Sequence, residues 1–185
     1  MFRGLFLDRD GVIIEHRSDY VRSWSDVCFY PQALRALALL KNTPIKIVVV
    51  SNQAGIGRGL INPEAAHEIN RRLVEEIRDT GGRVDGVYIC PHRPDENCVC
   101  RKPKPGLILR AAEDNSIDLS RSILIGDNLT DLLAGQAAGI GKLALVRTGI
   151  GEEQTKHPLP DGMPAFDVFA DLSQALQVMI HEQSI

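Results

Sequence analysis

Short apolar segments alternate along the chain with longer segments in which apolar residues recur at helical spacing. The continuous β-branched segment at residues 45–50 is typical of a strand buried on both faces. Asn62 followed by Pro63 is a typical helix start, and Ile69, Leu73 and Ile77 continue that helix at intervals of four. The pattern predicts strands over residues 2–7, 45–50, 84–89, 122–125, 142–146 and 168–170. It predicts helices over residues 31–40, 63–80, 106–115, 129–138 and 172–181.

The alternation of strands and helices predicts an α/β fold: a doubly wound, mainly parallel sheet with helices on both faces. Residues 151–164 are polar and contain three prolines, so we expect a surface loop there. The gaps after Gly11 and Ile89 are too short for a separate cap domain. We therefore expect residues 1–185 to form a single domain with an open ligand cleft.

Charge and hydropathy exclude several classes of partner. The net charge of −3 argues against non-specific electrostatic binding of nucleic acid. No apolar run approaches the roughly 20 residues that span a bilayer, and the apolar part of the first eight residues is too short for a signal peptide. We expect a monomeric cytoplasmic protein with no nucleic-acid or membrane partner.

Carboxylates follow two of the predicted strands. Asp8 and Asp10 come directly after the first strand, with Gly11 behind them, and Asp127 follows the fourth. The carboxyl ends of parallel strands meet at one edge of a sheet, where ligands bind. Extended geometry would place the Asp8 and Asp10 side chains on one face. Three converging carboxylates need a cation, and oxygen ligands suit magnesium.

A stiff basic segment lies further along the chain. Lys102 and Lys104 alternate with two prolines just before the helix predicted at Gly106. The alternative is a solvated basic loop. A fixed cation beside carboxylates is suited to phosphoryl transfer, where positioning and charge neutralisation dominate.

Four segments together resemble the motifs of the haloacid dehalogenase superfamily of phosphatases. Residues 6–12 resemble the first motif, although Val12 stands where threonine is usual. Ser51 and Asn52 match the second motif, Lys102 the third, and residues 126–131 the fourth. The resemblance implies a magnesium-dependent phosphatase with a Rossmann-like core.

The resemblance also implies roles for individual residues. Asp8 would attack phosphorus, and Asp10 would protonate the leaving alcohol and later activate water. Ser51 and Lys102 would hold the phosphoryl oxygens. Asp127 would bind magnesium together with Asp8 and the main-chain carbonyl of Asp10. For Asp131 two roles stay open, a contact with the metal or the cap of the helix.

A cluster of sulfur and imidazole ligands follows the third predicted strand. Cys90, His92, Cys98 and Cys100 can close a tetrahedral zinc shell in a loop over residues 90–100. A closed shell leaves no position for water, so the zinc would be structural. The alternative is free thiols beside a surface histidine. Cys28 stands apart and is expected to be a small buried hydrophobe.

This loop resembles the branch of the superfamily that contains heptose bisphosphate phosphatases and histidinol-phosphate phosphatases. The extended second motif, the Tyr20 segment and residues 104–106 favour a sugar bisphosphate, with loss of the 7-phosphate of a heptose 1,7-bisphosphate. Arg101 is the candidate contact for the second phosphate. Histidinol phosphate, a generic sugar phosphate or nucleotide, and a non-catalytic zinc-stabilised binding module are the alternatives. The residues expected to bind substrate are Tyr20, Asn52, Gln53, Arg101 and Asn128.

Overall fold

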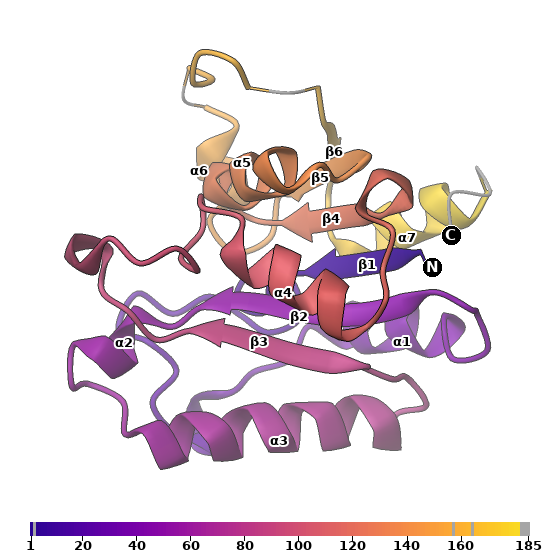
Figure 1. Ribbon diagram of the computed structural model, residues 1–185. Coiled ribbons are helices and arrows are strands. Elements are labelled where there is room, and N and C mark those ends of the chain that lie inside the picture. Colours follow the sequence, from indigo (N-terminus) through magenta and orange to yellow (C-terminus); the bar gives the residue numbers. More distant parts are fainter. Residues whose placement is uncertain (2, 157, 164, 182–185) are drawn as a thin grey trace.

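A six-stranded parallel sheet forms the centre of the computed structural model, which describes residues 1, 3–156, 158–163 and 165–181. Every neighbouring pair in it is parallel. In these residues the strands are β1 (Gly4–Leu7), β2 (Lys46–Asn52), β3 (Gly86–Cys90), β4 (Ile123–Gly126), β5 (Lys142–Val146) and β6 (Asp167–Phe169). Their order is β3-β2-β1-β4-β5-β6, so the chain winds outward in both directions from β1 (Figure 1). The predicted doubly wound sheet is confirmed.

Helices cover both faces of the sheet, as predicted. They are α1 (Pro31–Leu39), α2 (Ala54–Gly57), α3 (Pro63–Asp79), α4 (Gly106–Asp114), α5 (Leu129–Ala138), α6 (Gly151–Gln154) and α7 (Leu172–His181). One face packs against α1, α3 and α7, and the other against α4 and α5 (Figure 1). None of the helices in the described part of the chain is long and apolar enough to cross a membrane.

The alternation of side chains along β1 explains why both faces are buried. Leu5 and Leu7 belong to the apolar cluster under α1, α3 and α7, while Phe6 belongs to the cluster under α4 and α5. All three side chains are fully buried. A strand with two buried faces needs an uninterrupted apolar sequence, which residues 5–7 provide.

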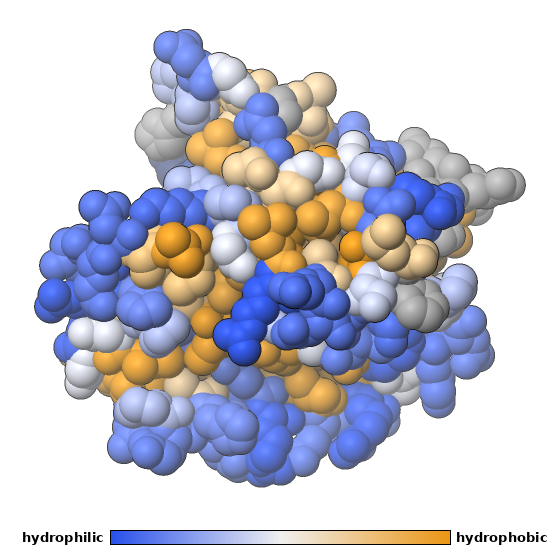
Figure 2. All heavy atoms as spheres, viewed as in Figure 1, coloured by the Kyte–Doolittle hydropathy of each residue, from blue (hydrophilic) through white to orange (hydrophobic). Residues whose placement is uncertain are grey.

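Helix α3 begins and ends close to the predicted residues. The Asn62 side chain accepts a hydrogen bond of 2.8 Å from Glu64 N, and Pro63 occupies the first helical position. Ile69, Leu73 and Ile77 are buried, while the outer surface of α3 is hydrophilic (Figure 2). This amphipathic pattern fixes which side of the helix faces the sheet.

Two short helices were not predicted. Residues 151–164 were expected to form a loop, but they begin with α6, and α2 lies in a segment left without an element. Each is a single turn, too short for an apolar periodicity to show. Phe2, at the start of the first predicted strand, lies outside the described residues, as do His157 and Pro164 in the predicted loop.

The connections beside the cleft are short. Residues 8–30 contain one 3₁₀ turn (Trp24–Asp26), and residues 91–105 contain another (Pro94–Glu96). These two fully described segments therefore hold no inserted domain over the carboxyl edge of the sheet, as the sequence predicted.

Burial along α1 predicts that two leucines of this helix contribute very differently to the free energy of unfolding. Leu37 is fully buried, whereas Leu39 is 62% exposed. Leu37→Ala should lower the free energy of unfolding by about 2–5 kcal/mol because it leaves a cavity in the core. Leu39→Ala should change it by less than about 0.5 kcal/mol. Urea unfolding of the two variants checks this, and equal losses would contradict the assignment of the α1 core face.

Candidate active site and metal-binding loop

A cavity of about 370 Å³ opens at the carboxyl edge of the sheet, where the strand order reverses between β1 and β4. Asp8 follows β1, and its main-chain N–H donates to Ile125 O across that junction at 3.0 Å. Of the residues predicted for catalysis, magnesium or substrate, those that line the cavity are Asp8, Asp10, Tyr20, Asn52, Gln53, Arg101, Lys102, Asp127 and Asn128.

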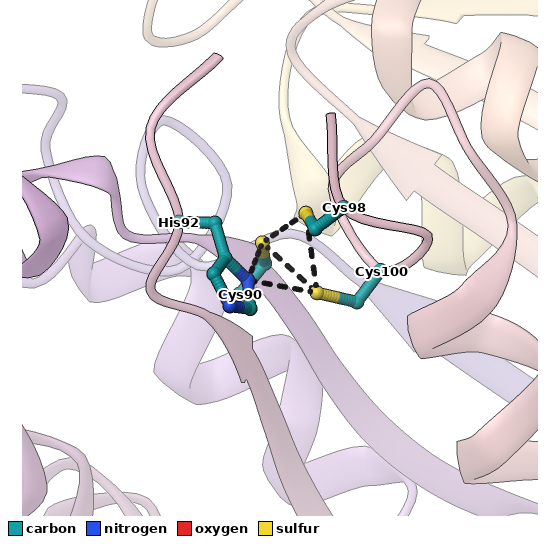
Figure 3. A group of neighbouring side chains, drawn as sticks. All are labelled: Cys90, His92, Cys98 and Cys100. Atoms are coloured by element: carbon teal, nitrogen blue, oxygen red, sulfur yellow. Dashed lines mark hydrogen bonds between the residues drawn. The ribbon is translucent and has the colours of Figure 1, made fainter. Parts of the chain in front are cut away.

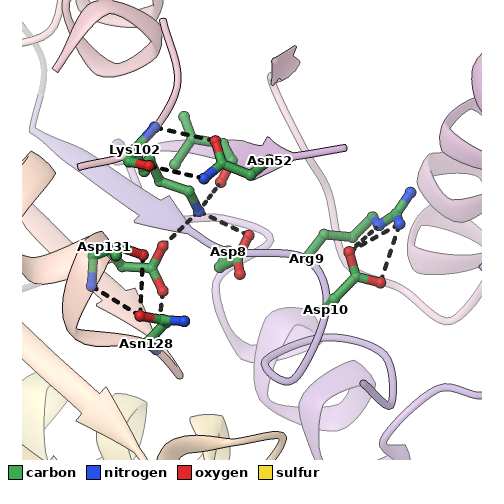
Figure 4. Close-up of polar contacts among 9 residues, drawn as sticks. Asp8, Arg9, Asp10, Asn52, Lys102, Asn128 and Asp131 are labelled. Atoms are coloured by element: carbon green, nitrogen blue, oxygen red, sulfur yellow. Dashed lines mark hydrogen bonds and ion pairs between the residues drawn. The ribbon is translucent and has the colours of Figure 1, made fainter. Parts of the chain in front are cut away.

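Lys102 is the buried cation of the site. Its Nζ lies 2.9 Å from Asp8 Oδ1 and 2.6 Å from Asp131 Oδ1, and it donates to Val50 O at 2.8 Å (Figure 4). These contacts use all three N–H donors of an ammonium group. Burial alone would lower its pKa, but the charges of Asp131 and Asp8 outweigh burial and hold the pKa of Lys102 above its ordinary value. Lys102 therefore stays charged.

Asp127 is packed between two glycines. A Cβ on Gly11 would lie 2.0 Å from Asp127 Oδ2, and one on Gly149 would lie 2.1 Å from the same oxygen. Both glycines have positive φ, of 81° and 62°. Thr148 Oγ1 donates to Gly11 O at 2.5 Å, and Ile150 N donates to Asp127 Oδ2 at 2.9 Å. The sequence interpretation missed Gly149, which lies in a turn with no motif of its own.

Asp131 both caps a helix and faces the cluster. Its Oδ2 accepts from Asn128 N at 3.1 Å at the start of α5, while its Oδ1 pairs with Lys102. Burial raises its pKa to about 6, although Lys102 opposes the shift. Asp131 therefore caps the helix and also pairs with Lys102. One of its oxygens also lies beside those of Asp8 and Asp127, so a contact of Asp131 with a metal ion stays a prediction.

The three carboxylates fit a divalent cation. Asp8, Asp127 and Asp131 each offer an oxygen, and these oxygens lie within 4.8 Å of one another. Burial, followed by the charges of Asp8 and Asp131, raises the pKa of Asp127 to about 8. Asp8 Oδ1 is buried and, apart from its ion pair with Lys102, accepts no hydrogen bond within the described residues. Such repulsion and such an under-bonded oxygen suit a hard cation with oxygen ligands.

Asp10 lies to the side of Asp8 and faces Arg9. The Arg9 Nη2 donates to both Asp10 oxygens, at 3.0 and 2.9 Å, and Nε donates at 3.2 Å (Figure 4). Asp8 and Asp10 line the same cavity, as expected, but their carboxylates have different partners. Arg9 was not singled out in the sequence, where the acidic motif drew attention to its neighbours.

The amides expected to contact substrate are engaged with the protein. Asn52 donates to Lys102 O and accepts from Lys102 N, each at 3.1 Å, so it holds both sides of the Lys102 main chain. The buried Gln53 amide lies against Arg9; with its oxygen turned to the guanidinium it accepts from Nη1 and, at 3.2 Å, from Nη2. Asn128 Oδ1 accepts from Thr130 N at 3.0 Å as the cap of α5.

Three further residues differ in their access to the cavity. Ser51 is buried at the end of β2 and does not line it. Tyr20 lines it with a left-handed backbone (φ 69°), and its ring packs against Gly55, where a Cβ would lie 3.2 Å from Tyr20 Cγ. Arg101 lines the cavity, and its Nη1 donates to His92 O at 3.4 Å.

Cys90, His92, Cys98 and Cys100 converge as expected (Figure 3). Cys100 Sγ lies 3.2 Å from Cys90 Sγ, 3.5 Å from Cys98 Sγ and 3.3 Å from His92 Nδ1. Contacts of this length fit four ligands around one tetrahedral ion. Burial, together with the Cys100 thiol, raises the pKa of Cys90 to about 12, so a cation is needed to keep it as a thiolate. Cys28 is exposed rather than buried, so that prediction is wrong.

Main-chain hydrogen bonds join the Cys/His loop to the segment after β2. Gln53 N donates to Cys90 O at 2.8 Å, and Gly57 N donates to Pro91 O at 2.9 Å. A Cβ on Gly57 would lie 2.7 Å from Pro91 O, so α2 approaches the loop closely. These bonds fix the start of the loop, and the bonds of Asn52 to the Lys102 main chain fix the segment that follows its end.

Comparison with known proteins places the chain in one family. The HAD-hydrolase-like family model matches residues 99–175. A D-glycero-beta-D-manno-heptose-1,7-bisphosphate 7-phosphatase of Pseudomonas aeruginosa is 37% identical over 93% of this chain and 96% of its own. The enzyme of the same name from Neisseria meningitidis serogroup A is 38% identical over 92% of each chain.

A solved structure supports the same conclusion. The D,D-heptose 1,7-bisphosphate phosphatase from B. bronchiseptica, crystallised with magnesium and phosphate, superposes with a TM-score of 0.90. It is 33% identical and matches 98% of this chain and 99% of its own. This chain is therefore a phosphatase of the haloacid dehalogenase-like hydrolases, and within them it belongs to the family of the D-glycero-beta-D-manno-heptose-1,7-bisphosphate 7-phosphatases.

Proposed function

We propose that the chain hydrolyses the 7-phosphate of D-glycero-D-manno-heptose 1,7-bisphosphate through an aspartyl-phosphate on Asp8. The observation that carries this proposal is the half-buried Asp8 carboxylate at the switch point of the sheet, 2.9 Å from Lys102 and beside Asp127. The heptose bisphosphate phosphatases it resembles, one of them crystallised with magnesium and phosphate, support the substrate and the cofactor.

In the first step Asp8 attacks phosphorus, the bond between phosphorus and the sugar oxygen breaks, and that oxygen takes a proton from Asp10. In the second step water attacks the phosphorus, Asp10 accepts its proton, and Asp8 is released with inorganic phosphate. Phosphorylation removes the negative charge of Asp8. A donor of Lys102 is thereby freed for a phosphoryl oxygen, with Ser51 as the second proposed contact.

Asp8, Asp127 and the main-chain carbonyl of Asp10 would hold magnesium, with Asp131 close by. When bound, magnesium supplies charge neutralisation at the phosphoryl oxygens. The carboxylate of Asp127 is already oriented by the protein, because Gly11 and Gly149 enclose it and Ile150 N donates a hydrogen bond to it.

Cys90, His92, Cys98 and Cys100 would hold a structural zinc ion, which stiffens the loop ahead of Arg101 and Lys102. Such a reduced cluster is typical of a cytoplasmic protein. The groups proposed for the site come from one copy of the chain, so we propose that residues 1–185 act as one domain and as a monomer.

Arg101 is the proposed contact for the phosphate that does not react. It lines the cavity, and its one hydrogen bond within the described part of the chain is a long one to His92 O, so the guanidinium has donors left for an anion. Tyr20, Asn52, Gln53 and Asn128 would shape the walls around the sugar.

Asp8→Asn should lower kcat by more than about a thousandfold, because the nucleophile is lost while the shape of the side chain is kept. Asp79→Asn, at an exposed aspartate on α3, should leave kcat unchanged. Steady-state phosphate release with the bisphosphate and magnesium checks both. Near-normal turnover by Asp8→Asn would rule out the covalent mechanism.

Purified protein should contain about one zinc ion per chain, measured by mass spectrometry of the metal content. Replacing Cys98 and Cys100 by Ala should abolish zinc binding and lower the melting temperature, since metal affinity contributes to folding. Cys28→Ala is the matched control and should change neither. Full stability and zinc content in the double variant would contradict a zinc site at this cluster.

Arg101→Ala should reduce kcat/KM for the bisphosphate by about 10–100-fold, the worth of a hydrogen bond to a charged group. It should affect a sugar monophosphate far less, because that substrate has no second phosphate. Arg93→Ala, at an exposed arginine of the same loop, serves as the control. Equal losses for both substrates would refute the role of Arg101, and faster hydrolysis of histidinol phosphate would replace the proposed substrate.

A further inference from the structure

We infer that Arg9, Gln53 and Asn70 form a positioning device that orients Asp10 for proton transfer to the leaving oxygen. The inference rests on the proposed function, in which Asp10 is the general acid and base. It adds a residue from α3, Asn70, which lies 61 positions from Arg9 in the sequence.

The Arg9 guanidinium is buried and fully hydrogen-bonded. The Arg9 side chain is only 4% exposed. Nε and Nη2 donate to Asp10, Nη1 donates to Asn70 Oδ1 at 2.9 Å, and the Gln53 oxygen takes the remaining donors of Nη1 and Nη2. All five donors of the group are thus used. A guanidinium held by three side chains has one orientation.

Asn70 is the polar exception on an apolar helix face. The other buried residues of α3 are Ala66, Ile69, Leu73 and Ile77, all apolar. Asn70 is 8% exposed, and a buried amide lowers stability unless it is hydrogen-bonded. Its Oδ1 accepts from Arg9. The energetic cost of this amide is explained if its oxygen is required to aim Arg9.

The main chain fixes the other end of the device. Arg9 O accepts from Ile13 N at 3.0 Å and from Ile14 N at 3.1 Å in the turn after β1. The guanidinium then holds both oxygens of Asp10, whose side chain is 22% exposed at the cavity wall (Figure 4). Asp10 is thereby kept apart from the Asp8, Asp127 and Asp131 cluster and faces the cavity, where a leaving alcohol would stand.

The chemistry of the leaving group separates positioning from simple stability. When Asp8 displaces a sugar alkoxide, the oxygen needs the proton of Asp10. When Asp8 displaces p-nitrophenolate, the phenolate leaves without that proton. A misaimed Asp10 should therefore slow the first step for the sugar phosphate and spare it for the aryl phosphate, whereas a general loss of folded enzyme slows both equally.

The test compares kcat/KM for heptose 1,7-bisphosphate and p-nitrophenyl phosphate in the magnesium-loaded enzyme. Asn70→Leu should lower the value for the bisphosphate about tenfold, a part of the 100-fold or more contributed by a general acid, and lower that for the aryl phosphate less than about twofold. Asn70→Asp keeps an acceptor oxygen at the same place and should restore the wild-type ratio. Arg71→Ala, on the exposed side of α3, is the matched control.

Asp10→Asn, measured alongside, separates the two levels of the inference. If Asp10→Asn discriminates between the two leaving groups and Asn70→Leu does not, the positioning device is refuted and the proposed mechanism stands. If Asp10→Asn lowers both values equally, Asp10 is not the general acid and both fail. If Asn70→Leu does not fold, the Asn70→Asp variant decides the test. A folded Asn70→Asp variant that loses the wild-type ratio of the two kcat/KM values refutes the device.

Discussion

A buried ammonium group, Lys102 Nζ, lies where four parts of the chain meet. Its partners come from the end of β1, the main chain of β2 and the first turn of α5, while Lys102 itself follows the Cys/His loop. A charge in such a place is tolerated only with close countercharges, and removal of one partner of a buried pair typically destabilises a protein by about 3–5 kcal/mol. The positions of these segments are therefore mutually dependent.

The Cys/His loop extends this dependence outward. Asn52 bonds both the N–H and the carbonyl of Lys102, and the loop holds the Arg101 side chain through His92 O. Gln53 bonds the same loop through its main chain while its side chain lies against Arg9. A few hydrogen bonds thus connect the four Cys/His side chains to Asp8, the proposed nucleophile, to Asp10, the proposed general acid and base, and to Arg101, the proposed contact of the second phosphate.

Much of this arrangement could be predicted from the sequence, because strands end where their apolar runs end. Asp8 and Asp127 follow such runs, and parallel pairing brings them together. The Cys/His cluster was predictable since its ligand types are rare within eleven residues. Gly149 was not, because its role depends on the position of the Asp127 oxygen in space. Asn70 was hidden in the same way, since its partner lies on a different element.

The packing of Asp127 between Gly11 and Gly149 has a consequence for how the family can diverge. A hydrogen atom in place of a side chain is what allows the carboxylate to stand there, and the two glycines lie far apart in the sequence but next to each other in the fold. Tyr20 lines the cavity outside this arrangement, and its ring packs against Gly55 instead. The position of the Asp127 carboxylate thus depends on two residues that have no side chain. A related sequence could keep every acidic motif and still be catalytically inactive if either glycine were replaced.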